Sequence, residues 1–286
     1  MSTQGNDGPT IAEEWDAHAA DYARLFAPLT GHIARSMLSM VQERLPSAPR
    51  ILDIACGPGD LAVAAAHLCA ERGAGSVLAT DISPAMVALT ERALAPINAD
   101  TRCEVRDGQA LGLEGGAFDA AFSCLGIFLF PDRHAAWRAA AEALRPGGVL
   151  VTSAWRGPEY NDLARAQMAP LMAALPARLT DPPLRPAWAR ITTAEGLVED
   201  VTGSAPLGDA EVHIVDATLA LPRPDAMWRG MVGNPVTATL IGQCDPTERE
   251  AVKAAVLEAF EQRSGGPDRP LLLNASCHVL IARRLG

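Results

Sequence analysis

The sequence predicts an α/β fold, in which a mostly parallel sheet of seven strands carries helices on both faces. Short apolar segments that are typical of strands alternate with helical segments through residues 46–155. A glycine-rich turn inside ILDIACGPGD (51–60) separates the first strand from the next helix. Open parallel sheets form ligand sites at such a turn. The alternation of strands and helices makes the predicted architecture Rossmann-like. We also expect the last strand, which contains CHVLIARR, to be antiparallel.

The elements follow from local patterns. Ser83 is a predicted N-cap with Pro84 at the first helical position, and Gly73 ends an alanine-rich helix. The predicted helices are 11–27, 30–45, 60–72, 83–94, 132–144, 192–202 and 246–263. The predicted strands are 50–55, 76–80, 101–106, 117–128 with its exit, 149–155, 210–221 and 271–285.

Residues 1–286 are predicted to form one domain with four parts. Residues 11–45 form an N-terminal helical lid, and residues 46–155 form a cofactor-binding core. The proline-rich stretch 156–190 is an insertion after the fifth strand that caps the substrate, and residues 191–286 complete the sheet.

Composition and charge limit the partners. The net charge of −10, without a Lys/Arg run, would repel a phosphate backbone and disfavours nucleic-acid substrates. The apolar stretch 120–131 is too short to span a membrane, and the polar N-terminus lacks a signal-peptide layout. Six scattered cysteines without CxxC pairing indicate free thiols in a cytoplasmic protein. A homodimer is one candidate assembly.

Three aspartates follow or interrupt the first three strands. A buried carboxylate at Asp53 is costly unless a positive group meets it, and it would repel the pyrophosphate of a dinucleotide. Asp81 ends the second strand, where it can accept hydrogen bonds from ribose hydroxyls, and Asp107 follows the third strand within reach of an adenine edge. A sugar site, a base site and a pocket that tolerates a cation together describe S-adenosylmethionine.

At these residues the sequence resembles the class I S-adenosylmethionine-dependent methyltransferases, in particular the ubiquinone/menaquinone and natural-product group of secondary metabolism. The resemblance rests on ILDIACGPGD, VLATDISPAMV, VRDGQAL, FDAAFSCLGIFLFPD and ALRPGGVLVTSAW. These motifs stand in the family's order across residues 11–155, and the likeness is looser over 192–286.

The resemblance implies a role for each motif residue. Asp53 and the loop from Gly57 to Gly59 would line the methionine end of the cofactor. Asp81 would hold the ribose hydroxyls, and Asp107 would accept from the adenine amino group. The other implied contacts are Ile82 and Met86 on the two adenine faces, Gly108 and Gln109 through their backbone, and Ser123 and Cys124 beside the sulfonium. The family's N-terminal aromatic pattern corresponds to Trp15, His18, Tyr22 and Phe26, with Tyr22 pointing at the methionine end.

The catalytic requirements are small because the sulfonium is already activated, so alignment and water exclusion dominate. A general base is needed only if the acceptor must lose a proton, and the candidates are His18, His134 and His213. A metal is not expected, because Ser123 and Cys124 stand where the metal-dependent catechol enzymes of this superfamily have an aspartate. The segment DPPL (181–184) lacks the aromatic residue of the motif in amino-methylating nucleic-acid enzymes.

The acceptor is expected to be a small, partly apolar metabolite methylated at oxygen or carbon. The candidate chamber residues are Phe128, Phe130, Met168, Leu171, Met172, Trp188, Trp228 and Met231. Two alternatives stay open at the level of sequence. One is an S-adenosylmethionine-binding protein that aids another reaction such as a cyclisation, and the other is a nucleotide-dependent oxidoreductase.

Overall fold

One seven-stranded sheet organises the chain. The computed structural model describes residues 10–180 and 187–286, and its strands run in the order β3-β2-β1-β4-β5-β7-β6. The strands are β1 (Arg50–Ile54), β2 (Ser76–Asp81), β3 (Asp100–Val105), β4 (Phe118–Ser123), β5 (Leu144–Trp155), β6 (Leu207–Leu221) and β7 (Leu271–Arg284). β1 to β5 pair in parallel, and β7 is antiparallel to both β5 and β6. The predicted mostly parallel sheet with an antiparallel last strand is confirmed.

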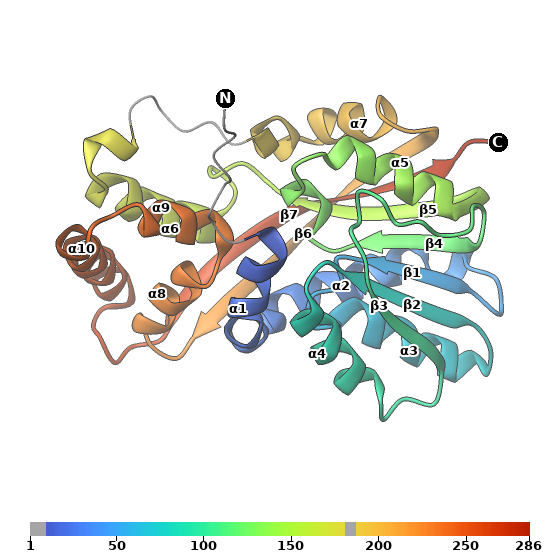
Figure 1. The fold of residues 1–286 in the computed structure, drawn as a ribbon, viewed down its shortest axis with the longest axis horizontal. Helices are drawn as coiled ribbons and strands as arrows, with labels where there is room; N and C mark the ends of the chain where they lie inside the picture. Colours follow the sequence, from blue (N-terminus) through green and yellow to red (C-terminus); the bar gives the residue numbers. More distant parts are fainter. Residues whose placement is uncertain (1–9, 181–186) are drawn as a thin grey trace, which may run out of the picture.

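Helices cover both faces of this sheet (Figure 1). On one face lie α2 (Ala27–Val41), α3 (Asp60–Arg72) and α4 (Pro84–Leu94), and on the other lie α5 (Arg133–Ala143) and α7 (Ala194–Thr202). α2 packs against α3 and β6, and it buries Leu29, Ile33, Ala34, Met37 and Val41. α2 is therefore part of the layered core, and α1 (Ile11–Leu25) is the part of the predicted lid that stands outside it.

Local signals set the element boundaries as expected. α3 has the predicted limits and ends at Gly73, which adopts φ +67°. Ser83 caps α4 by accepting a hydrogen bond from the Met86 N–H at 3.1 Å. β5 differs from the expectation, because it begins at Leu144 and the RPGG segment, with Gly147 at φ +78°, belongs to the strand. Pairing of Leu144 with Phe118 overrides the turn signal.

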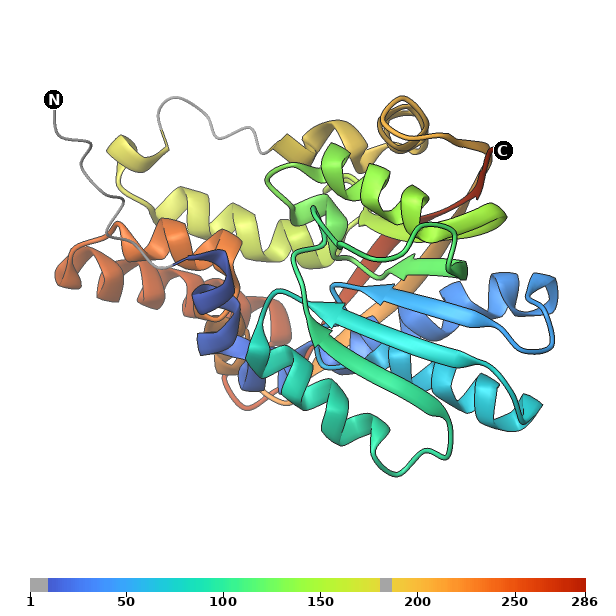
Figure 2. The same cartoon turned by 45° about the vertical axis from the view of Figure 1, so that its right-hand side comes forward.

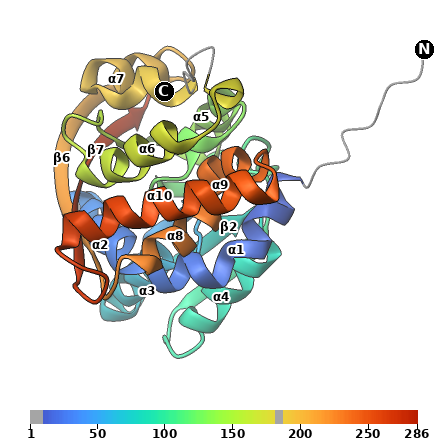
Figure 3. The same ribbon diagram turned by 90° about the vertical axis from the view of Figure 1, so that its left-hand side faces the viewer.

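A long two-stranded arm carries a helical cap (Figures 1 and 2). β7 pairs with β5 only over 277–283 but with β6 over 271–284, so the hairpin extends beyond the parallel strands. α6 (Asp162–Ala174), α8 (Asp225–Val232), α9 (Pro235–Gly242) and α10 (Pro246–Ser264) gather at this end, with α10 packed on α6 and α8 (Figure 3). Three of these four helices come from the segment between β6 and β7, so a cap confined to 156–190 is too small.

Short 3-10 helices complete the chain: η1 (Gln42–Arg44), η2 (Ile127–Leu129), η3 (Ala177–Leu179) and η4 (Ala187–Thr192). The DPPL segment at 181–184 lies outside the described residues. Throughout 10–180 and 187–286, we find no helix whose length and apolar character would let it cross a bilayer.

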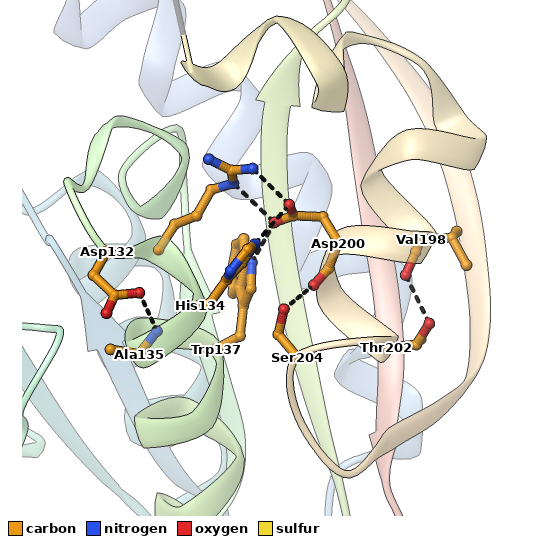
Figure 4. Close-up of polar contacts among 9 residues, drawn as sticks. Asp132, His134, Ala135, Trp137, Val198, Asp200, Thr202 and Ser204 are labelled. Carbon is orange, nitrogen blue, oxygen red and sulfur yellow. Dashed lines mark hydrogen bonds and ion pairs between the residues drawn. The ribbon is translucent and has the colours of Figure 1, made fainter.

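The partly buried carboxylate of Asp200 joins α5 to α7 (Figure 4). Asp200 accepts hydrogen bonds from Arg133 Nε at 2.9 Å, Arg133 Nη2 at 2.6 Å and Trp137 Nε1 at 2.9 Å. His134 Nε2 lies 3.0 Å from the same carboxylate. Burial opposes ionisation, but the hydrogen bonds from Arg133, Trp137 and His134 outweigh it and lower the pKa of Asp200. The cluster clamps two helices on one face of the sheet.

Removing this carboxylate should destabilise the fold. Asp200→Ala leaves the Arg133 guanidinium without its partner in a site where both side chains are about one-tenth exposed. We expect a loss of ~3 kcal/mol in the free energy of unfolding, measured by urea denaturation. Because the folded-state pKa is lowered, the contribution is complete above the unfolded value of about 3.9 and is lost as pH falls through the folded pKa.

The matched control is Asp225→Ala, which breaks the exposed Asp225–Arg229 pair on α8 and should cost under about 1 kcal/mol. Equal, small losses in both variants would show that Asp200 does not clamp α5 to α7.

Candidate functional site

A cavity opens at the carboxyl ends of the central strands. It encloses about 980 Å³, its open mouth included, and lies where β1 neighbours β2 on one side and β4 on the other. This is the point at which the strand order reverses, where open α/β sheets bind their ligands. The wall includes these sequence-predicted residues: Trp15, Tyr22, Asp53, Gly57, Asp81, Ile82, Met86, Asp107, Gly108, Gln109, Cys124 and Phe130.

Strained backbone shapes the floor of the cavity. Ala55 after β1 has φ +56° and Leu125 after β4 has φ +54°, and both residues line the wall. Such conformations in non-glycine residues concentrate at functional sites. Gly57 lines the wall at φ +55°, whereas Gly59, at φ +98°, packs against Thr90 and supports the turn from outside the wall.

Asp53 is a buried carboxylate with an unsatisfied oxygen. It is 1% exposed and lines the cavity, and its Oδ2 has no hydrogen-bond partner among the described residues. Burial raises the pKa of Asp53 to about 8; a backbone hydrogen bond from Ala62 opposes the shift, and the charges of Asp81 and Asp60 add to it. A cation beside this carboxyl group would stabilise its ionised form, so the site fits the ammonium of S-adenosylmethionine.

Asp81 ties the glycine loop to the end of β2. Its Oδ2 accepts from the Gly57 N–H at 2.9 Å, and its Oδ1 accepts from the Ser83 N–H at 3.0 Å. Burial raises the pKa of Asp81, partly offset by backbone hydrogen bonds from Ser83, Gly57 and Ile82. The carboxylate is thereby held in place at the wall, with acceptor capacity left for hydroxyl groups.

The Asp107 turn has a structural and a wall role. Asp107 Oδ1 accepts from the Gln109 N–H at 2.8 Å, which is the local turn that an Asp-Gly pair favours. Gly108 lies so close to Phe130 that a Cβ would approach its ring to 2.5 Å. All three residues of Asp107–Gln109 line the cavity, so the turn shapes part of its wall.

α1 closes one side of the cavity. Trp15 and Tyr22 line the wall and pack edge to face, with ring centroids 5.6 Å apart. Asp16, which no sequence motif marks, accepts from the Ala85 N–H at 2.9 Å and from the Ser83 hydroxyl. α1 is thus fixed to the N-terminus of α4, beside the residue that also holds Asp81. Only the long-range contact between 16 and 83–85 reveals this role.

The end of β4 contributes one of its two predicted residues. Cys124 lines the wall, donates weakly to the Thr30 carbonyl at 3.7 Å, and has a thiol pKa raised by burial. Ser123 is fully buried outside the wall, where its hydroxyl accepts from the Ile127 N–H at 3.2 Å. Ser123 therefore braces the strand exit.

The three candidate histidines lie away from this wall. His134 is held by Asp200, His213 stands 3.7 Å from Glu211 on β6, and His18 faces Gly233 at the end of α8. The structure does not support a base at these positions. Among the candidate chamber residues Leu171, Trp228 and Met231 are buried in the cap, and the side chain of Trp188 lies outside what the structure describes.

The wall is strongly acidic. It holds Asp53, Asp60, Asp81 and Asp107, and its single arginine, Arg106, is bound to Glu104 at 2.6 Å and to the Leu111 carbonyl at 2.6 Å. This charge pattern suits a cationic ligand and opposes a pyrophosphate. Within the described ranges, no group of three or more His, Cys, Asp or Glu residues is arranged to hold a metal ion.

Comparisons with known proteins agree with this site. Residues 51–148, from β1 into β5, match the sequence model of a methyltransferase domain. The methyltransferase tpcH of Aspergillus fumigatus is 30% identical over 135 residues, which cover 46% of this chain and 46% of that protein. The malonyl-[acyl-carrier protein] O-methyltransferase of Magnetococcus marinus is 28% identical over 184 residues, covering 57% of this chain and 66% of that protein.

The fold comparison extends further along the chain. The YcgJ protein of Bacillus subtilis matches with a TM-score of 0.56 and 15% identity, covering 89% of this chain and 99% of that one. At this identity the likeness shows the fold alone. By sequence, the chain spans about half the length of the curated relatives it matches. The matched family model covers residues 51–148, about a third of the chain, and ends before the cap begins.

Replacing Asp53 should separate stability from binding. The folded-state pKa of Asp53 is raised, so the folded state binds the extra proton and the unfolding free energy falls as pH rises from about 4 to 8. Asp53→Asn removes the buried charge and should raise the unfolding free energy by about 1–3 kcal/mol at pH 9. The same variant should bind S-adenosylmethionine at least about tenfold more weakly, measured by calorimetry.

Asp100→Asn, on the exposed start of β3, is the control and should change neither quantity. A stabilised Asp53→Asn variant with full cofactor affinity would show that Asp53 does not meet the ligand.

Proposed function

Because the chain belongs to the class I S-adenosylmethionine-dependent methyltransferases, we propose that it methylates a small, partly apolar metabolite at oxygen or carbon. The observation that carries the proposal is the unpaired Asp53 oxygen in an acidic cavity at the switch point of the sheet. Bound there, S-adenosylmethionine would supply an activated methyl group for transfer to the acceptor.

The residues of the wall divide the binding task. Asp53 would meet the ammonium, and Asp81 would accept from the ribose hydroxyls while its backbone hydrogen bonds keep it oriented. Ile82 and Met86 supply apolar surface for the adenine. Trp15 and Tyr22 on α1 would exclude water from the reacting centre, which makes α1 a lid.

The acceptor class follows from the remaining wall. Leu125, Leu129, Phe130 and Pro131 form an apolar surface beside Cys124 at the exit of β4. Since no histidine lines the cavity in the described chain, alignment supplies the main catalytic effect. One relative is named an O-methyltransferase and another, from Cellvibrio japonicus, a C-methyltransferase, so the relatives support oxygen and carbon acceptors alike.

Cofactor binding is tested by titrating S-adenosylmethionine and NAD side by side into the wild type and Asp81→Ala. The wild type should bind S-adenosylmethionine and not NAD. The variant should lose ~1.5–3 kcal/mol of affinity, because ribose hydroxyls lose a charged acceptor. Asp100→Ala serves as the control, and a melting curve checks that the glycine loop survives the loss of Asp81. If Asp81→Ala binds S-adenosylmethionine with the wild-type affinity, Asp81 does not hold the ribose hydroxyls.

Turnover is tested separately with cell extract fractions as acceptor source. Formation of S-adenosylhomocysteine supports methyl transfer. A cofactor that stays intact while an acceptor is converted would instead identify a protein that uses it without transfer, for example in a cyclisation.

A further inference from the structure

Asp60 is a wall carboxylate that the cofactor motifs leave without a role. It is the first residue of α3 and lies in the cavity wall beside Leu61. Asp53, Asp81 and Asp107 already account for the ammonium, the ribose and the adenine. Asp60 therefore adds a negative charge that these three contacts do not require.

The surroundings hold Asp60 without neutralising it. The Thr30 hydroxyl donates to its Oδ2 at 2.9 Å. Gly31 leaves room for its Oδ1, since a Cβ on Gly31 would lie 2.9 Å from that oxygen. In the part of the chain that the structure describes, Asp60 forms no ion pair, although Arg35 of α2 lies near enough to offset its charge in part. The carboxylate is fixed but still carries uncompensated charge.

Asp60 lies on the Cys124 side of the cavity, because Thr30 contacts both residues: its carbonyl accepts from the Cys124 thiol at 3.7 Å and its hydroxyl donates to Asp60. The family resemblance implies that Cys124 borders the sulfonium. Consistent with this placement, the charge of Asp60 helps to raise the pKa of Tyr22 and of Cys124, behind the dominant effect of burial. Both residues line the same wall. Burial also raises the pKa of Asp60 itself, opposed by the Thr30 hydrogen bond and by Arg35. A positive charge placed here would lower the pKa of each of these three groups by stabilising its ionised form.

The two forms of the cofactor differ in charge at one atom. The sulfonium of S-adenosylmethionine is positive, whereas the thioether sulfur of S-adenosylhomocysteine is neutral. Both carry the same ammonium, ribose and adenine, so Asp53, Asp81 and Asp107 do not distinguish them through direct contacts. A fixed carboxylate near the sulfur does, because Coulomb attraction acts on only one of the two.

We propose that Asp60 is a specificity-determining residue that selects the sulfonium form of the cofactor over its neutral thioether product. The inference rests on the proposed function. It assigns to Asp60 an attraction for the charged reactant that the neutral product does not receive, so that the loss of charge on transfer weakens this one contact and favours product release.

The test compares dissociation constants by calorimetry, without any acceptor. In Asp60→Asn, affinity for S-adenosylmethionine should fall about tenfold and affinity for S-adenosylhomocysteine should change little, so their ratio falls about tenfold. Asparagine keeps an oxygen for the Thr30 hydroxyl. The matched control is Thr30→Val, which removes the hydrogen bond between Thr30 and Asp60 but keeps the carboxylate, and it should leave the ratio unchanged. Asp60→Glu should retain most of the wild-type ratio.

The outcomes separate the two claims. If Asp60→Asn leaves the ratio unchanged, or if Thr30→Val lowers it equally, Asp60 only joins α2 to α3 and the inference fails while the proposed function stands. If the wild type binds neither ligand, the proposed function fails together with the inference. Melting temperatures show whether each variant is folded before its ratio is read.

Discussion

The molecule is organised around a carboxylate that its own fold leaves unsatisfied. Asp53 lies on β1, the strand that pairs with both β2 and β4 at the centre of the parallel sheet. Burying an anion there opposes folding, and the raised pKa of Asp53 records that cost. The neighbouring features are consistent with a ligand that relieves it, because the strained turns at Ala55 and Leu125 open the cavity directly above this strand.

The cavity wall is held together by hydrogen bonds between separate elements. Asp16 on α1 accepts from Ser83, the Ser83 N–H donates to Asp81, and Asp81 accepts from Gly57. A continuous series of hydrogen bonds therefore joins α1, the N-terminus of α4, the end of β2 and the glycine loop. Two of these contacts use backbone N–H donors and the third joins two side chains, and together they preorganise the site for its ligand.

Local chemistry explains which features the sequence predicts well. The limits of α3, the Ser83 cap and the turn at Asp107 depend on residues within a few positions of each other. Most of the cavity wall follows from motifs that each mark the carboxyl end of one strand. These are properties that a reader of the chain can recognise without knowing its long-range contacts.

Long-range packing accounts for what the sequence does not reveal. Asp16 and Asp60 become meaningful only through contacts with residues 83–85 and Thr30, and His134 is drawn to Asp200 sixty-six residues away. The cap is assembled from segments on both sides of β6, and α8 and α9 have eight residues each, too short for a clear helical period. The predicted lid of residues 11–45 likewise forms two different parts, α1 and α2. α2 belongs to the core because it packs on β6, which follows it by more than 160 residues.

Asp53 is expected to bind a cationic group of the ligand, and the number of protons released on binding tests this most directly. With its pKa raised to about 8, Asp53 is mostly protonated in the free protein at pH 7, and an ammonium beside it would lower that pKa. S-adenosylmethionine titrated at pH 7 into two buffers of different ionisation enthalpy should give binding enthalpies that differ in the direction of proton release. Asp53→Asn should abolish the difference. Equal enthalpies for the wild type in both buffers, or proton uptake, would contradict the account.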